Sequence, residues 1–405
     1  MTVTAEHTEP TTRATIRAIV PTIKAAKPTI KAAATDTALP VVLGLFVIAV
    51  VFGSLSEHFL SAENLTNLAL QMAATGTIAL GVIMVLLLGE IDLSVGSVSG
   101  LCAVEMTVLN VRHDVHPGLA VAAAIATGAA IGLLHGLMVT FLRMPSFVVT
   151  LSGLIGWQGL MLYLLGKGGT IDLPYDGEIA SLSDTWLAPG LAWAVVAAIV
   201  GTYAAVLLIS RRARANAGLP VTAWPWLVVR IGGLAVVLVT AVSVLSADRG
   251  VPLTFLIFGS LVVLLDLVLR HTVGGRRIYA VGGNAEAARR AGINVRRVRI
   301  IGFMSASTLA AIGGILAASR LAAVNQSSGG SDTLLIAVAA AVIGGASLYG
   351  GKGRTYAALL GILVLQAVTN GMLLLNVDSS VRFMVTAGVL ALAVAIDSIA
   401  RPARQ

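Results

Sequence analysis

The chain has 405 residues, of which 57% are hydrophobic and 11% are charged, and its mean hydropathy is +0.93. A soluble domain could not cover so much apolar surface with so few polar side chains, so the composition excludes that class and predicts a multi-spanning membrane protein. The net charge of +8 comes from basic residues scattered between apolar segments, a distribution that does not favour nucleic-acid binding. The single cysteine, Cys102, cannot form a disulfide within the chain.

Residues 1–38 form a polar N-terminal segment with a near-repeat, P-T-I-K-A-A-K followed by P-T-I-K-A-A, between Pro21 and Ala33. The apolar segment that follows is too long for a signal peptide. We expect residues 1–38 to be a disordered cytoplasmic tail, with a second short tail at residues 401–405. A basic amphipathic anchor on the membrane surface is the alternative, and the two prolines of the repeat disfavour it.

Apolar segments long enough to cross a membrane recur along residues 39–400, which we interpret as one transmembrane domain. A hydrocarbon core of about 30 Å needs roughly 20 apolar residues per helix, and lipid requires a helix to satisfy its own backbone groups. The expected fold is therefore all-α with about 12 transmembrane helices. The segments are 39–55, 70–89, 94–111, 118–141, 146–165, 190–209, 226–246, 251–269, 300–321, 333–348, 355–375 and 380–400.

The distribution of lysine and arginine predicts the orientation of these spans, because short cytoplasmic loops carry an excess of positive charge. Twelve spans with both termini in the cytoplasm place most of the 27 basic residues inside. The loop 166–189 falls outside and is acidic. The basic residues left outside are Arg112, Lys167, Arg249, Arg320 and Arg382.

The segment G-E-I-D-L-S-V-G-S, Gly89 to Ser97, places two acids and two serines between the second and third spans. Asp92 or Ser94 could cap the third helix, because free backbone N–H groups would otherwise stay unpaired in lipid. Broken helices also line substrate paths in transporters. The two interpretations are compatible.

Three glycines of the fourth span, Gly128, Gly132 and Gly136, recur every four residues on one helical face. Such a face lets a neighbouring helix approach closely, so we expect a packing role. A flexible gate is the less favoured alternative.

Other ionisable residues lie within the spans, where charge is costly and suggests function. Glu105 lies deep in its span. His135, Asp266 and Asp397 fall near span ends, so we expect their side chains to reach the interface. No group of His, Cys or acidic residues has metal-ligand spacing, and no G-x-S-x-G nucleophile motif is present.

Residues 270–299 form a charged loop with eight arginines between two spans. Within it, Asn284 can cap a helix, Glu286 suits the first turn, Arg289 suits the last, and Gly292 can close the helix in the left-handed conformation. The pattern predicts a helix of about two turns, which is too short to be stable alone and should lean on another surface. The loop either docks an aqueous partner or only sets the topology.

No phosphate-binding loop is present. The nearest approaches to G-x-x-x-x-G-K-[ST], at Lys167 and Lys352, have Met161 and Ala346 in place of the first glycine, and glycine follows each lysine. If ATP drives this protein, a separate subunit must hydrolyse it.

Most of residues 39–400 resembles the permease subunits of bacterial ATP-binding-cassette (ABC) sugar importers of the ribose and xylose group. The resemblance rests on G-E-I-D-L-S-V-G-S at Gly89, M-P-S-F-V-V-T-L at Met144, R-R-I-Y-A-V-G-G-N at Arg276, E-A-A-R-R-A-G-I-N at Glu286, V-I-G-G-A-S-L-Y-G-G-K-G-R at Val342 and T-N-G-M at Thr369.

This resemblance implies a homodimer in the bacterial inner membrane that binds an ABC ATPase, which holds ATP and Mg²⁺, and an external sugar-binding protein. The chain itself would hold no cofactor. The sugar path would pass the Gly89–Ser97 break and Asn370, with Glu90, Asp92, Ser94 and Ser97 as its residues in the break. The segment similar to the family's coupling helix comprises Asn284, Glu286, Ala287, Ala288, Arg289 and Gly292.

Two further features refine the resemblance. Ribose-type permeases look like ten-span proteins, whereas residues 190–246 add two spans here, as in the xylose-type permease. The family's E-L-D-A-I-A-A reads L-L-I-A-V-A-A, so Leu334 and Ile336 replace both acids and no role of those acids carries over.

Two other classes of protein fit the composition less well. A proton-coupled secondary transporter would use Glu90, Asp92, Glu105 and Asp266 as its relay. A membrane enzyme would need a catalytic constellation, which the sequence lacks.

Overall fold

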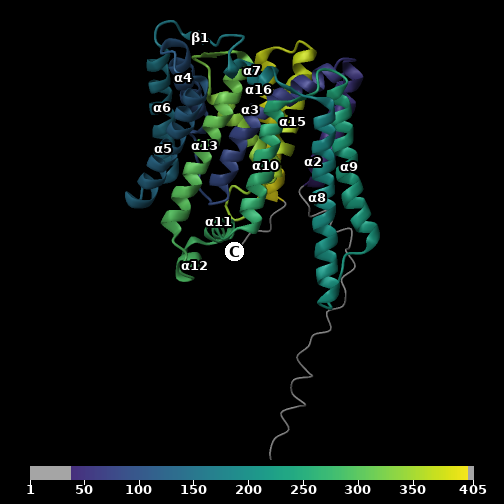
Figure 1. Cartoon of the computed structure of the whole chain (residues 1–405). Helices are drawn as coiled ribbons and strands as arrows, with labels where there is room; N and C mark the ends of the chain where they lie inside the picture. Colours follow the sequence, from purple (N-terminus) through teal and green to yellow (C-terminus); the bar gives the residue numbers. More distant parts are fainter. Residues whose placement is uncertain (1–37, 400–405) are drawn as a thin grey trace, which may run out of the picture.

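The computed structural model describes residues 38–399, so the expectations for the two tails lie outside the described residues. Each of the twelve predicted segments overlaps a helix, and the long helices run side by side (Figure 1). They are α2 (Ala38–Leu55), α3 (Ala62–Leu86), α4 (Val95–Arg112), α5 (Pro117–Phe141), α6 (Ser146–Leu165), α8 (Pro189–Asn216), α9 (Trp224–Ser246), α10 (Leu253–His271), α13 (Val295–Leu321), α14 (Ser331–Ile343), α15 (Tyr356–Leu374) and α16 (Ser379–Ile399).

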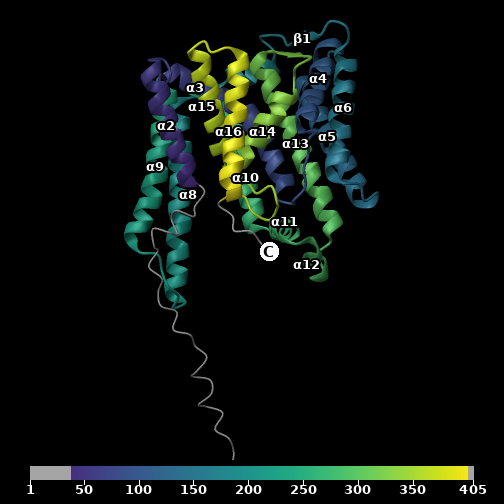
Figure 2. The same ribbon diagram turned by 180° about the vertical axis from the view of Figure 1, so that it is seen from behind.

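The short elements gather at the two ends of the bundle. One end carries β1 (Thr170–Asp172), α7 (Glu178–Asp184), β2 (Trp186–Leu187), β3 (Val251–Pro252) and β4 (Ala323–Asn325), and we call it the β1 end. The opposite end carries α11 (Val273–Gly283) and α12 (Ala285–Arg290), and we call it the α12 end; the view from behind shows the same separation (Figure 2).

Eight of the described helices are long and apolar enough to cross a membrane: α3, α5, α6, α8, α9, α10, α13 and α15. Three further apolar stretches, Val41–Leu55, Ser331–Ile343 and Ser379–Leu392, are shorter. The expected span 333–348 is wrong in its extent, because α14 ends at Ile343 and the glycine-rich residues 344–353 turn away. A helix of 13 residues is about 20 Å long, so α14 crosses only part of a 30 Å core.

The all-α expectation omits four short strands, which pair outside the helices. β1 pairs antiparallel with β4, with Ile171 opposite Val324, and β2 pairs with β3. Both pairs tie the long loop after α6 to distant segments of the chain. The loop is therefore part of the folded bundle.

The glycine face of α5 packs on α13, which together with α3 forms the buried centre of the bundle. A Cβ added at Gly128 would lie 2.7 Å from the Ala311 Cβ. At Gly132 it would lie 2.6 Å from the Met304 Cα, and at Gly136 it would lie 2.8 Å from the Ile300 Cα. All three glycines therefore serve close helix packing.

The chain re-enters the bundle after β4. Residues 326–330 contact the first half of α4, where a Cβ at Gly96 would lie 2.8 Å from the Gly329 oxygen. A Cβ at Gly100 would overlap the Ser328 oxygen. Short α14 begins directly after this contact, inside the bundle.

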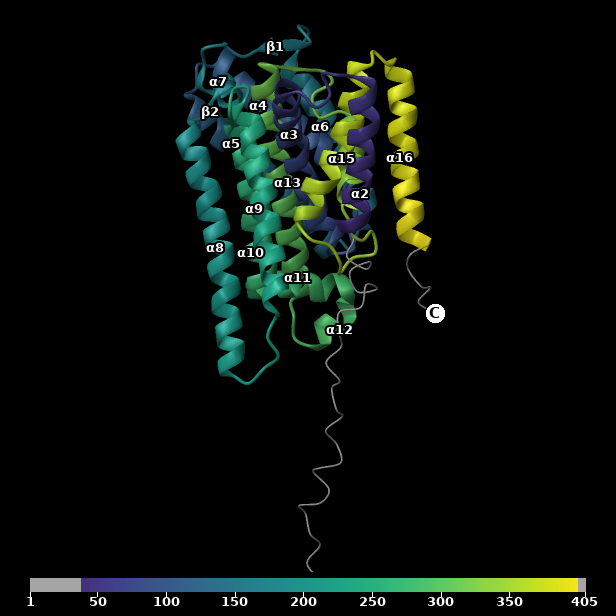
Figure 3. The same cartoon turned by 90° about the vertical axis from the view of Figure 1, so that its right-hand side faces the viewer.

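The hairpin of α8 and α9 lies on the outside of the bundle (Figure 3). Its buried side chains gather at the β1 end, where Ala192, Val196, Val242 and Leu245 pack with Leu187 and Val251. The rest of the hairpin is largely exposed to the surroundings of the protein.

Candidate functional site

The predicted short helix in the charged loop is confirmed as α12. Asn284 is its N-cap, and the Asn284 side chain accepts a hydrogen bond of 2.9 Å from the Ala287 N–H. Glu286 pairs with Arg289, and at 3.2 Å with Arg290. Gly292 has φ = +81°, the left-handed conformation expected of a closing glycine.

One face of α12 is open to a partner. The side chains of Arg289 and Arg290 are 70% and 80% exposed, and Ala287 is exposed beside them. Ala288, by contrast, is only 5% exposed. It faces the membrane domain and holds the helix in place, so it does not belong to the outer surface of α12.

Helix α11 lies across the end of the bundle and carries α12, as all three views show (Figures 1–3). Thr272 caps α11 by accepting a hydrogen bond from the Gly275 N–H. Two residues of α11, Ile278 and Val281, have buried side chains. The Tyr279 hydroxyl donates to the Gly353 carbonyl at 2.9 Å. Burial raises the pKa of Tyr279, so the hydroxyl stays a neutral donor.

Three glycine-containing segments meet beneath α11, and we call their contact the glycine junction: Gly89, Gly282 and Gly350–Gly351. The Leu87 carbonyl accepts a hydrogen bond from the Gly351 N–H at 2.9 Å. A Cβ on Gly282 would overlap that carbonyl, and one on Gly350 would lie 2.6 Å from the Gly282 oxygen and 2.8 Å from the Gly89 Cα. Backbone therefore packs directly on backbone, and α11 is in rigid contact with the start of the 89–97 break.

The break itself is tied to α13. Glu90 pairs with Arg299 at 2.9 Å, and their side chains are 12% and 31% exposed respectively. Arg299 lies near the α12 end of α13, a few residues after α12. The charged loop thus contacts the break both through the glycine junction and through this ion pair.

A chain of buried polar groups continues from the break into the bundle. Asp92, 4% exposed, accepts hydrogen bonds from the Ser94 N–H at 2.8 Å and the Ser94 hydroxyl at 2.6 Å. The Ser94 Oγ lies 3.5 Å from His135 Nδ1, and Trp157 donates to His135 Nε2 at 3.0 Å. Because Nε2 accepts, the neutral ring carries its proton on Nδ1 and donates toward Ser94.

These contacts decide between the two capping candidates and correct the expectation for His135. Ser94 occupies the N-cap position of α4 without a side-chain capping bond, and Asp92 instead binds the Ser94 N–H. His135 does not reach the interface, since it is only 2% exposed. Gly153 of α6 explains its burial, because this glycine lets the His135 ring lie where a larger side chain would stand.

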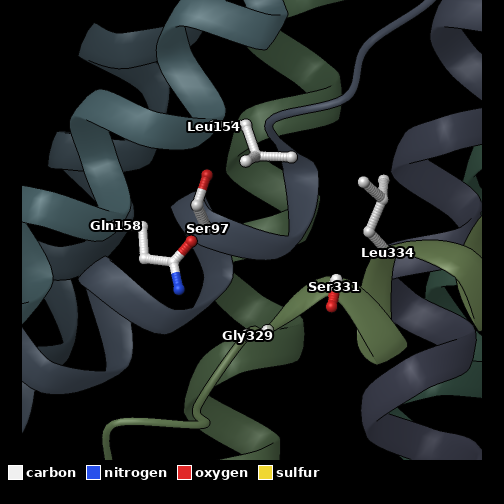
Figure 4. Close-up of a pocket in the computed structure, with 7 residues that line it drawn as sticks. Ser97, Leu154, Gln158, Gly329, Ser331 and Leu334 are labelled. Atoms are coloured by element: carbon white, nitrogen blue, oxygen red, sulfur yellow. The ribbon is translucent and has the colours of Figure 1, made fainter.

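Ser97 lines a pocket of about 60 Å³ between α4, α6 and the start of α14 (Figure 4). Gln158 of α6 and Ser331 also line it, and their polar groups are neutral. Leu334 of α14 forms part of the apolar wall of this pocket with Leu154.

Asn370 lies far from the break in the fold. Near the β1 end, its side chain exchanges two hydrogen bonds with Asn64, at 2.8 and 2.9 Å, and so joins α15 to α3. The Asn64 amide also donates to the Phe59 carbonyl. The fold of this chain thus does not bring Asn370 together with the four residues of the break, which are Glu90, Asp92, Ser94 and Ser97.

The remaining carboxylates bind separate partners. Glu105 accepts a hydrogen bond of 2.9 Å from Thr127, which joins α4 to α5. Asp266 pairs with Arg270 at 2.8 Å and contacts Thr355. Asp397 lies in α16, and its side chain is outside what the structure describes. Within residues 38–399, no group of three or more His, Cys, Asp or Glu could hold a metal ion.

Sequence reasoning missed α11, Gln158 and the glycine junction. The signal for α11 was weak, because four of its eleven residues are glycine and its helix depends on packing beneath it. Gln158 is a polar residue in a span and could have been singled out. The junction joins segments up to about 260 residues apart, such as Leu87 and Gly351, which the sequence order does not reveal.

Residues 64–395 match the family described as branched-chain amino acid transport system / permease component. The xylose transport system permease protein XylH of Haemophilus influenzae is 34% identical over 369 residues, which cover 89% of this chain and 96% of that protein. XylH of Escherichia coli K12 is 33% identical over 340 residues, which cover 84% of this chain and 86% of that protein.

The ribose import permease protein RbsC of Escherichia coli K12 is 32% identical over 359 residues, which cover 88% of this chain and 92% of that protein. No solved structure matches the chain. The matches extend over the break, α11, α12 and the pocket, and the eight spanning helices agree with a multi-pass membrane protein. The chain therefore belongs to the family of bacterial inner-membrane ABC-importer permeases that includes the xylose and ribose permeases.

Proposed function

We propose that this chain is the membrane subunit of an ABC importer for a pentose, with xylose as the favoured sugar. The names of the similar proteins give xylose or ribose as the transported sugar. Both sugars are neutral pentoses. The α8–α9 hairpin is the added two-span segment that favours the xylose type. ATP and Mg²⁺ would bind to a separate ATPase subunit.

We propose twelve spans with the α12 end in the cytoplasm. The α12 end carries the arginines of the charged loop, and the five basic residues expected outside, Arg112, Lys167, Arg249, Arg320 and Arg382, lie toward the β1 end. This distribution follows the excess of positive charge in cytoplasmic loops. The short α14 counts as a span together with the re-entering residues 326–330.

The ATPase would bind the outer face of α12, with Glu286, Ala287 and Arg289 at its centre. The observation that supports this proposal is the direct backbone contact between α11 and the other segments of the glycine junction. A partner that pushes α12 also moves α11, and the backbone contacts of Gly282 pass that movement to Leu87 and the break. Tightly packed contacts of this kind have little freedom to absorb a displacement.

The sugar would pass along the pocket of Ser97, Gln158 and Ser331, at the interface of two copies of the chain. Neutral hydroxyl and amide groups suit a neutral sugar, since they bind it by hydrogen bonds without holding an ion. An external sugar-binding protein would dock on the β1 end. In this arrangement Asn370 supports the helices at that end.

A proton-coupled transporter is the alternative function. Its relay would need Glu90, Asp92, Glu105 and Asp266 to exchange protons. In the structure these carboxylates bind Arg299, Ser94, Thr127 and Arg270 respectively. Each is engaged in a local contact between helices or within the break, which favours structural roles for them.

Co-purification of the ATPase tests the docking surface. Ala287→Arg adds bulk to the exposed face of α12 without weakening the helix, because arginine is a good helix former. We expect this variant to insert into the membrane normally and to lose its ATPase partner. Asp176→Arg, which adds the same side chain in the loop at the β1 end, is the control. Equal ATPase recovery with both variants would exclude α12 as the docking site.

A further inference from the structure

The end of the α8–α9 hairpin that lies on the α12 side has an unusual composition. Between Pro189 and Ser246 the chain has four arginines and no acidic residue. All four lie in the last turns of α8 or the first turns of α9, as Arg211, Arg212, Arg214 and Arg230. Two tryptophans, Trp224 and Trp226, are exposed at the same place.

Two of these arginines shape the turn of the hairpin. Arg211 stacks over the Trp224 ring at 4.2 Å and donates from Nε to the Thr222 carbonyl at 3.1 Å. Arg214 donates from Nε to the Pro220 carbonyl at 3.2 Å. Each of these hydrogen bonds uses one of the five N–H groups of its guanidinium. These contacts hold Arg211 and Arg214 against the turn.

The other two arginines are available to a ligand. Arg212 and Arg230 are exposed, and within residues 38–399 neither forms a hydrogen bond, an ion pair or a ring contact. No acidic side chain of the hairpin can neutralise them. A ligand for this surface must therefore carry negative charge.

The depth of the hairpin identifies the ligand. Helix α8 has 28 residues, about 42 Å, which matches the full thickness of a bilayer with its headgroups of about 40–45 Å. Tryptophan favours the interface between hydrocarbon and water, so Trp224 and Trp226 place the turn at the headgroups. Arg230 lies about 6 Å further into the membrane than Trp226, within reach of the interface for a long side chain.

The surroundings of this turn leave room for lipid. The hairpin is buried against the bundle at the β1 end, whereas on the α12 side Leu227 is its only buried residue among those described. Acyl chains can therefore surround α8 and α9 on the α12 side, where the two helices do not pack against the bundle. The arginines then stand where lipid phosphates lie.

We propose that Arg212 and Arg230, supported by Arg211 and Arg214, bind the headgroup of an anionic phospholipid in the cytoplasmic leaflet. Arginine binds phosphate oxygens through two parallel N–H groups, which favours this contact over a loose attraction. The leaflet rests on the orientation given under the proposed function. The lipid contact itself does not depend on that orientation.

Native mass spectrometry of the full-length protein tests this site, with phosphatidylglycerol and phosphatidylcholine as the two probes. We expect the wild-type protein to retain phosphatidylglycerol after detergent exchange and the Arg212→Gln/Arg230→Gln variant to retain at least fivefold less. Arg276→Gln/Arg277→Gln removes the same charge from exposed positions on α11 and should retain the wild-type amount. Equal loss in both variants, or equal retention of the two lipids, would overturn the site.

A second measurement separates the leaflet from the lipid. Ala217→Cys places a thiol in the turn of the hairpin, and the native Cys102 is buried. A membrane-impermeant maleimide should label the Ala217→Cys variant only after the cells are permeabilised. Labelling of intact cells would contradict the cytoplasmic leaflet and the proposed orientation, while the retention of phosphatidylglycerol would still report on the arginines.

Discussion

The Gly351 N–H donates to the Leu87 carbonyl at 2.9 Å, and Gly282 packs against the same carbonyl. This contact joins the glycine-rich loop after α14, the break after α3 and the helix that carries α12. A side chain on Gly282 would separate all three segments. The proposed coupling between the α12 surface and the sugar path therefore requires a glycine at position 282.

Gly282→Ala should impair transport more than insertion. The added Cβ would overlap the Leu87 carbonyl and must displace backbone, at a cost of about 1–3 kcal/mol for overpacking. The adjacent Gly283 has no atom within 4 Å of an added Cβ, so Gly283→Ala is a matched control. We expect reconstituted uptake to fall at least tenfold for the first variant and to stay near normal for the second. Similar uptake by both variants would contradict the role of the junction.

Gly132→Ala should destabilise the packing of α5 on α13. Its Cβ would lie 2.6 Å from the Met304 Cα, whereas a Cβ on Gly156 of α6 would meet nothing within 4 Å. We expect Gly132→Ala to cost about 1–3 kcal/mol and to lower the thermal unfolding midpoint of the protein in detergent. Gly156→Ala should leave the midpoint almost unchanged. A gate at Gly132 would instead change uptake without changing the midpoint.

Glu90→Gln should destabilise the break because it leaves Arg299 without its ion pair at 2.9 Å. Breaking a buried ion pair costs about 3–5 kcal/mol and breaking an exposed one less than about 1 kcal/mol, so we expect an intermediate loss for this partly buried pair. Asp248→Asn, which unpairs the more exposed Arg249, is the control. Thermal unfolding measures both losses. Replacing both partners, as Glu90→Leu with Arg299→Met, should recover part of the stability.

Gln158→Leu should weaken sugar transport while the ATPase still binds. The variant removes an amide from the neutral pocket beside Ser97 and keeps the side chain close in size. We expect a rise of severalfold in the half-saturating concentration for uptake. Ser152→Ala on the same helix is the control, since Ser152 bonds to its own Val148 carbonyl. If uptake by Gln158→Leu is unchanged, the sugar does not use this pocket.

The sequence predicted those parts of the structure that depend on residues close to one another along the chain. Asn284, Glu286 and Gly292 predicted α12 because caps act within one turn of helix. The repeated glycines predicted that one face of α5 packs closely against another helix, although the sequence did not identify that helix as α13. The spans followed from apolar length.

Contacts between distant segments could not be predicted in this way. His135 was expected at the interface from its position in the span, yet Gly153 and Trp157 of α6 enclose it. Ala288 belongs to the docking motif in sequence but points into the protein. The glycine junction and the separation of Asn370 from the break depend on how helices assemble, and a single sequence does not fix that assembly.

Uptake of labelled xylose by proteoliposomes is the most direct test of the proposed function. The vesicles would carry this chain and its ATPase, with ATP in the compartment that faces α12 and the sugar-binding protein on the side of the β1 end. We expect uptake to require ATP and to persist when a protonophore collapses the proton gradient. Uptake that proceeds without ATP and stops on addition of the protonophore would contradict an ATP-driven importer and favour proton coupling.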